Sequence, residues 1–177
     1  AYLAYYGMDS GQDNAKAPFV YYDINRDESL ALLTLTSCIY NGAYRDCLAE
    51  MFSEIKALGI KNLAVDLREN GGGSSYVANE FIKYLSCDSY MVDTTLWRFG
   101  IFEFGSGSGI MQNEKYSDLT FSGNLYILTS SNTFSSAMMF AQYIGDNDLG
   151  TLIGEAPGNL PSGYGDVAVF QMPNSGL

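Results

Sequence analysis

The chain of 177 residues contains no histidine and only nine lysine and arginine residues, against twenty aspartate and glutamate residues. Its formal net charge of −11 disfavours nucleic acid and anionic membranes as partners, because both attract clusters of basic side chains. No apolar run approaches the roughly 18 residues that a membrane-spanning helix needs. We therefore expect neither a nucleic-acid partner nor insertion into a membrane.

Cysteine is scarce as well, with Cys38, Cys47 and Cys87 as the three thiols. They form no C-x-x-C pair and have no histidine to complete a ligand set, so a zinc site is not expected. No other cofactor is expected. Cys38 and Cys47 are predicted to be buried structural thiols. The odd number of cysteines neither requires nor excludes one disulfide.

Hydrophobic residues make up 47% of the chain and aromatic residues 14%, which is typical of a folded domain with a substantial core. Residues 1–18 are predicted to be an N-terminal extension or the remnant of an upstream segment. Residues 19–177 are predicted to form one core domain that is incomplete at its C-terminal end.

The apolar periodicity predicts an α/β fold with a mainly parallel sheet covered by helices. The predicted strands are 19–24, 30–37, 62–67, 90–104, 125–129, 151–153 and 167–172. The predicted helices are 44–58, a second that begins at Ser74 or Ser75, and 135–144. Loops that lead from strands into helices would place the active groups at one edge of such a sheet.

Two of these loops carry residues suited to chemistry. The first, Asp66–Gly73, ends in three glycines, which let the backbone turn tightly and present its N–H groups without obstruction. This loop could form half of an oxyanion hole, or it could be only a tight turn between a strand and a helix. It lacks the G-x-x-x-x-G-K-[ST] spacing of a nucleotide-binding P-loop.

The second loop delivers Ser135 and Ser136 to the first turn of a helix. The N–H groups and the dipole at a helix start stabilise negative charge beside a serine hydroxyl, which suits a nucleophile. Taken alone, a serine pair in this position is usually a helix cap. The segment is not the G-x-S-x-G turn of the α/β-hydrolases.

Three segments together resemble one family. The run 62–73 is similar to the hydrophobic strand and D-L-R-x-N-x-G-G signature of the carboxy-terminal-processing (tail-specific) serine peptidases. Thr133–Ala137 resembles the nucleophile segment of that family, and Leu152–Glu155 resembles its following I-G-E strand. The resemblance covers residues 19–173 and is strongest to the branch with tricorn-core-like members. It implies a crotonase-like fold of stacked βα units, here without the PDZ domain that is common in the family.

The resemblance also assigns roles to particular residues. It implies that Ser135 is the nucleophile and that the N–H of Ser136 donates to the oxyanion. Gly72, or else Gly71, would supply the second donor. Support roles in shaping the turn are implied for Arg68 and Asn70.

The general base is the one catalytic role of the family for which this chain has no matching residue. The lysine that serves as base in the common branch corresponds to Leu160, and the other branch uses a histidine, which this chain lacks. A serine hydroxyl needs a base before it becomes a strong nucleophile. We expect the base outside this chain, on further segments or on a partner chain, with Glu155, Tyr164 and Asp166 as alternatives within it.

The resemblance therefore implies a serine endopeptidase core that hydrolyses polypeptides through an acyl-enzyme, in an extracellular or bacterial cell-envelope location. Because the base is missing, one alternative is a catalytically inactive module of the same fold that binds peptides or apolar ligands. A third interpretation is a crotonase-like acyl-CoA enzyme, because that fold shares stacked βα units and paired backbone amides.

Overall fold

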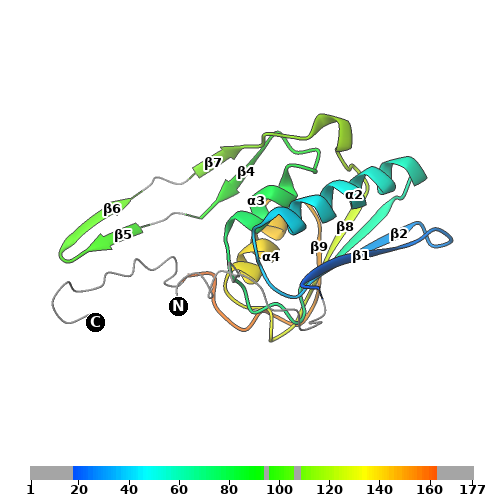
Figure 1. Cartoon of the computed structure of the whole chain (residues 1–177). Helices are drawn as coiled ribbons and strands as arrows, with labels where there is room; N and C mark the ends of the chain where they lie inside the picture. Colours follow the sequence, from blue (N-terminus) through cyan, green and yellow to red (C-terminus); the bar gives the residue numbers. More distant parts are fainter. Residues whose placement is uncertain (1–17, 94–95, 106–108, 163–177) are drawn as a thin grey trace.

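The computed structural model describes residues 18–93, 96–105 and 109–162. Within them, helices pack on a five-stranded sheet, and a two-stranded extension projects from this body (Figure 1). Residues 1–17 of the predicted extension at 1–18 and the predicted strand at 167–172 lie outside the described residues.

The central sheet has the strand order β1-β2-β3-β8-β9. Its strands are β1 (Val20–Asn25), β2 (Leu30–Leu35), β3 (Asn62–Asp66), β8 (Asn124–Thr129) and β9 (Thr151–Gly154). β1 and β2 form an antiparallel pair, and the later neighbours β2–β3, β3–β8 and β8–β9 are parallel. Parallel neighbours need crossover connections, which the helices supply here. The predicted α/β fold with a mainly parallel sheet is confirmed.

Aromatic side chains pack between the three helices. They are α2 (Gly42–Leu58), α3 (Tyr76–Ile82) and α4 (Ser136–Asp146). Phe52 of α2 lies 5.7 Å from Phe81 of α3, and Phe81 lies 5.1 Å from Phe140 of α4, measured between ring centroids. The helices therefore pack on the same side of the sheet (Figure 1).

Side chains alternate between the two faces of the sheet. Those on the helix side are fully buried: Ala31, Leu33, Leu63, Val65 and Ile127. Complete burial of one such leucine, valine or isoleucine contributes on the order of 1.5–3 kcal/mol. Leu32 and Tyr126 lie on the opposite face and are only partly buried. A register slip of one residue would exchange the two sets, so burial of the helix side specifies the register.

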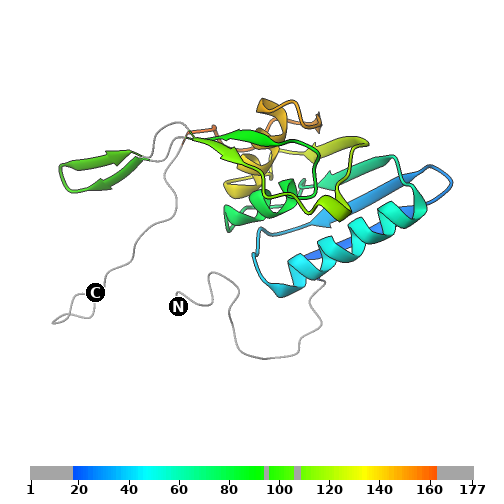
Figure 2. The same cartoon turned by 90° about the horizontal axis from the view of Figure 1, so that it is seen from above.

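The prediction of one strand at 90–104 is wrong in detail, because the chain there folds into two antiparallel ribbons. One pairs β4 (Ser89–Val92) with β7 (Gly109–Gln112), and the other pairs β5 (Leu96–Phe99) with β6 (Phe102–Gly105). Gly100 adopts a φ of 61°, which permits the two-residue turn between β5 and β6. Figure 2 shows the β5–β6 ribbon extending away from the sheet and helices.

Two smaller features complete the described part. A short 3-10 helix, η1 (Ser117–Leu119), precedes β8. In the residues that the structure describes, no helix combines the length and the apolarity needed to cross a membrane.

Candidate active site

Two loops meet at the carboxyl edge of the parallel strands. One follows β3 and the other follows β8. The N–H of Leu67 donates to the carbonyl of Leu128, and the N–H of Phe134 donates to the carbonyl of Asn70, each at 3.0 Å. The structure thus brings together the two segments that the sequence singled out.

Ser135 occupies an unusual backbone conformation in this junction. Its φ is 53° and its ψ is −124°, a region that non-glycine residues rarely adopt and that costs about 1–3 kcal/mol. The turn leads from a strand into α4, as does the strained turn that presents the nucleophile of α/β-hydrolases. The Ser135 side chain is exposed, and its hydroxyl has no hydrogen-bond partner within the described residues.

Ser136 differs from its neighbour in each of these respects. Its side chain is buried, and its hydroxyl donates to the carbonyl of Gly73 at 2.8 Å. Its backbone N–H lies at the first position of α4 and has no acceptor in the described part of the chain. Ser136 therefore holds the serine loop against the glycine loop, while Ser135 presents a free hydroxyl.

Gly72 lies directly against this serine pair. A Cβ added to Gly72 would stand 2.6 Å from the Cβ of Ser135 and 3.0 Å from the nitrogen of Ser136. The φ of Gly72 is also 100°, which side-chain-bearing residues rarely adopt. Its N–H already donates to the side-chain oxygen of Asn70, at 2.9 Å. Gly71, by contrast, has open space where a Cβ would be.

The N–H of Gly73 faces the serines. Cys38 pairs with Gly73 as in a parallel bridge, with the Cys38 N–H donating to Gly72 and the Ser74 N–H donating to Cys38. In such a bridge, the N–H and carbonyl of the middle residue point to the other side. The Gly73 carbonyl indeed accepts from Ser136, and the Gly73 N–H has no acceptor among the described residues.

Asn70 connects the surrounding elements. It is fully buried, and its side-chain amide donates to the carbonyl of Leu35 at 2.8 Å. Its side-chain oxygen accepts from Gly72 and, at 3.5 Å, from the thiol of Cys38. The support role predicted for Asn70 thus has a definite geometry, because one side chain joins the end of β2 to the glycine loop.

Two further residues shape the serine loop, and the sequence had assigned a role to neither. Thr133 is fully buried, and its hydroxyl donates to Leu67 at 2.8 Å and accepts from the N–H of Ser130. The side-chain oxygen of Asn159 accepts from the N–H of Ser135 at 2.8 Å. The only signal for Asn159 was its position next to Leu160, where the family places a base.

The remaining predicted residues lie around the junction. Leu160 is 75% exposed. The carboxylate of Glu155 accepts from the N–H of Ser131 at 3.4 Å rather than from Ser135. Tyr164 and Asp166 lie outside the described residues.

Arg68 forms an ion pair at the end of β3. Its guanidinium pairs with both carboxylate oxygens of Asp66, at 2.9 and 2.7 Å. The hydrogen bond and charge of Arg68 lower the pKa of Asp66. The backbone carbonyl of Arg68 accepts from the hydroxyl of Ser130, so Arg68 supports the serine loop through its main chain.

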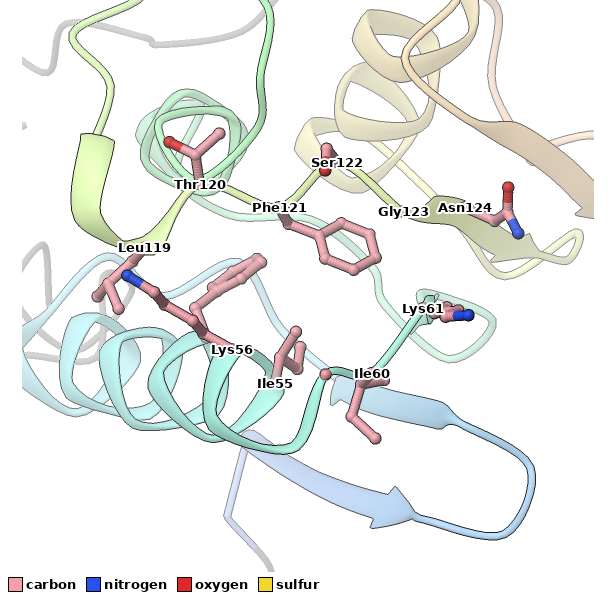
Figure 3. A pocket seen from close by; sticks show the side chains of 12 residues that line it. Ile55, Lys56, Ile60, Lys61, Leu119, Thr120, Phe121, Ser122, Gly123 and Asn124 are labelled. Carbon is pink, nitrogen blue, oxygen red and sulfur yellow. The ribbon is translucent and has the colours of Figure 1, made fainter.

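One pocket lies away from this junction. It measures about 420 Å³ and is bordered by Lys56, Lys61, Phe121 and Asn124 (Figure 3). These residues precede β3 and β8 or begin them, whereas Gly72 and Ser135 follow the ends of the same strands. The pocket is therefore at the opposite edge of the sheet and is not part of the candidate active site.

Residues 29–164 match Peptidase family S41. The match extends over more than half of the chain, so the chain belongs to peptidase family S41. Comparison with curated proteins gives no match.

Solved structures share the fold. A candidate peptidase from Parabacteroides merdae ATCC 43184 is 20% identical with a TM-score of 0.62, over 89% of this chain and 48% of that one. The photosystem II D1 C-terminal processing protease is 19% identical with a TM-score of 0.57, over 72% of this chain and 31% of that one. Mature CPAF is 10% identical with a TM-score of 0.55, over 70% of this chain and 36% of that one. At these identities the likeness establishes the fold alone, and this chain spans less than half of each structure.

Proposed function

We propose that the chain is the core of a serine endopeptidase that hydrolyses polypeptides through an acyl-enzyme. The observation that carries the proposal is Ser135, an exposed hydroxyl on a strained backbone at the start of α4. Strained, non-glycine conformations persist where the surroundings impose them, and they cluster at active sites. Membership of peptidase family S41 supports a polypeptide as the substrate.

In the proposed reaction, the Ser135 oxygen attacks the scissile carbonyl carbon while a base takes the hydroxyl proton. The tetrahedral oxyanion then receives hydrogen bonds from backbone N–H groups. The N–H of Ser136 is one proposed donor. The amine leaves with the proton from the base, and water hydrolyses the acyl-enzyme.

The second oxyanion donor comes from the glycine loop. The N–H of Gly72 remains a prediction, but it would have to leave the side chain of Asn70 before it could donate to substrate. The N–H of Gly73 is unoccupied among the described residues and lies on the side that contacts Ser136. We therefore favour Gly73 over Gly72 and Gly71.

The base is proposed to lie outside the described residues, on further segments or on a partner chain. Leu160 cannot accept a proton, and Glu155 is hydrogen-bonded to Ser131. An extracellular or cell-envelope location, and cleavage near the C-termini of substrates, are proposed from the resemblance to carboxy-terminal-processing peptidases.

An alternative proposal is an inactive module that binds peptides without cleaving them, and its motivation is the missing base. The two proposals differ in turnover of an unfolded polypeptide such as reduced casein by the native full-length protein. We expect hydrolysis that Ser135→Ala lowers by at least about 10⁴-fold. The matched variant Ser136→Ala keeps its backbone N–H but loses the hydrogen bond to Gly73, so it should lose far less activity than Ser135→Ala. Equal rates in Ser135→Ala and wild type would refute the peptidase, and no turnover would favour the binding module.

A further inference from the structure

Two tyrosine rings pack together on the surface beside the candidate active site. The ring centroids of Tyr40 and Tyr76 are 5.8 Å apart with an interplanar angle of 42°. Tyr40 is 38% exposed and Tyr76 is 66% exposed. Paired aromatic side chains at a surface present a rigid apolar face at low conformational cost.

Both tyrosines lie a short distance along the chain from the contact of Gly72 with Ser135. Tyr40 is two residues after Cys38, which is hydrogen-bonded to Gly72 and Ser74. Tyr76 is four residues after Gly72, and four residues of chain span at most about 14 Å. A substrate peptide of the same number of residues covers the same distance. The tyrosine pair therefore lies within reach of residues flanking a scissile bond held at Ser135.

Two neighbouring side chains, Glu80 and Arg45, hold the ring of Tyr40 in place. Its hydroxyl donates to the carboxylate of Glu80 at 3.3 Å, and Glu80 is only 4% exposed. That carboxylate also accepts from Tyr116 at 2.8 Å and pairs with Lys83 at 3.3 Å. The guanidinium of Arg45 lies 5.8 Å from the centroid of the Tyr40 ring. Tyr40 is thus held in place before any ligand arrives.

We propose that Tyr40 and Tyr76 form a subsite for a large apolar or aromatic side chain of the polypeptide substrate, within about four residues of the scissile bond. The inference rests on the proposed function, because the position of Ser135 selects a peptide as the occupant. Ring faces attract aromatic and apolar groups, and the hydroxyl of Tyr40 is already satisfied by Glu80. Arg45 adds a positive charge in a chain whose net charge is −11.

The test measures peptide binding in the absence of cleavage. Native full-length protein carrying Ser135→Ala is titrated into fluorescein-labelled octapeptides of alanine and serine, with a single phenylalanine placed in turn at each position. Fluorescence anisotropy gives the affinity. At one or two positions, phenylalanine should bind about tenfold more tightly than alanine. Adding Tyr76→Ala or Tyr40→Ala should abolish this preference, and Tyr76→Phe should retain it.

The control variant is Tyr21→Ala, which removes an exposed tyrosine of β1 on the sheet face opposite the helices. It should leave the preference for phenylalanine unchanged. A preference that survives Tyr76→Ala, or no preference at any position, would overturn the subsite. Equal loss in Tyr21→Ala would overturn it as well.

A separate readout distinguishes failure of the subsite from failure of the proposed function. Wild-type protein is treated with a small fluorophosphonate, whose reaction with Ser135 does not need the tyrosine pair. An adduct without a preference for phenylalanine would support the proposed peptidase function and refute the subsite. Phenylalanine preference without an adduct would leave the subsite as the peptide site of an inactive module.

Discussion

Gly72 and Ser135 approach so closely that a methyl group on Gly72 would lie 2.6 Å from the Cβ of Ser135. This distance is shorter than side-chain carbons tolerate, and the neighbouring atoms include the backbone of Phe134 and Ser136. The contact joins the loop after β3 to the loop after β8. The candidate site therefore depends on the absence of a side chain at position 72 as much as on the serine.

Gly72→Ala should disrupt the site. The new Cβ would push the serine loop away, and the φ of 100° would be strained with any side chain. We expect a loss of about 3 kcal/mol in the free energy of unfolding and loss of reactivity at Ser135. Gly71→Ala is the matched control, because open space surrounds position 71 and its φ is ordinary. Urea titration of both variants is the measurement, and equal stabilities would contradict the close contact.

The strain at Ser135 predicts that glycine and alanine variants rank in opposite order of stability at positions 135 and 136. Glycine relieves a positive φ, so Ser135→Gly should be more stable than Ser135→Ala by about 1 kcal/mol. Ser136 begins α4, where glycine is worse than alanine by up to about 1 kcal/mol. Ser136→Gly should therefore be less stable than Ser136→Ala. Thermal unfolding of the four variants tests this, and the same order at both positions would show that Ser135 is unstrained.

Asn70→Ala should destabilise the fold although it removes only three heavy atoms. It leaves the carbonyl of Leu35 and the N–H of Gly72 buried without their partners, at a combined cost of about 3 kcal/mol. The melting temperature should fall by roughly 6–12 °C. The control is Asn132→Ala: among the described residues its exposed side-chain amide donates to Glu69 alone, and its loss should change stability by less than about 0.5 kcal/mol. A similar effect in both variants would contradict the account of Asn70.

Cys38 should make stability depend on alkaline pH. Burial raises the pKa of its thiol to about 12, so the folded chain keeps a proton that the unfolded chain releases above about pH 9. The contribution is complete below that pH and is lost as the pH rises toward the folded pKa. Stability should fall by about 1 kcal/mol per pH unit just above pH 9. Cys38→Ala should reduce the slope by this amount in urea titrations between pH 8 and 9.5, on top of the slope that buried tyrosines such as Tyr44 add in both proteins, and an unchanged slope would refute the assignment.

Much of the fold was predictable, because strands β1, β2, β3 and β8 each carry a local apolar pattern that the sheet buries on one face, while the short apolar strand β9 stays exposed. The meeting of the two loops was also predictable, since parallel strands end at one edge. The positive φ of Ser135 was not, because it is imposed by distant partners: Phe134 bonds to Asn70, and Ser135 bonds to Asn159.

The engagement of the Gly72 N–H was equally hidden from the sequence. It depends on where the side chain of Asn70 points, and that direction is set by its bond to Leu35 in another strand. Residues 90–104 were predicted as one strand because the signal for a turn within them is a single glycine, Gly100. Local pattern thus predicted elements, and long-range hydrogen bonds decided the site.

The most direct test of the central claim is the mass of a fluorophosphonate adduct, mapped by tandem mass spectrometry after treatment of the native full-length protein. One adduct is expected, on Ser135; it should disappear in Ser135→Ala and still form in Ser136→Ala. Heat-unfolded protein should acquire none, because the strained turn and its backbone donors no longer exist. An adduct on Ser136, or no adduct on the folded protein, would contradict the assignment of Ser135 as the nucleophile.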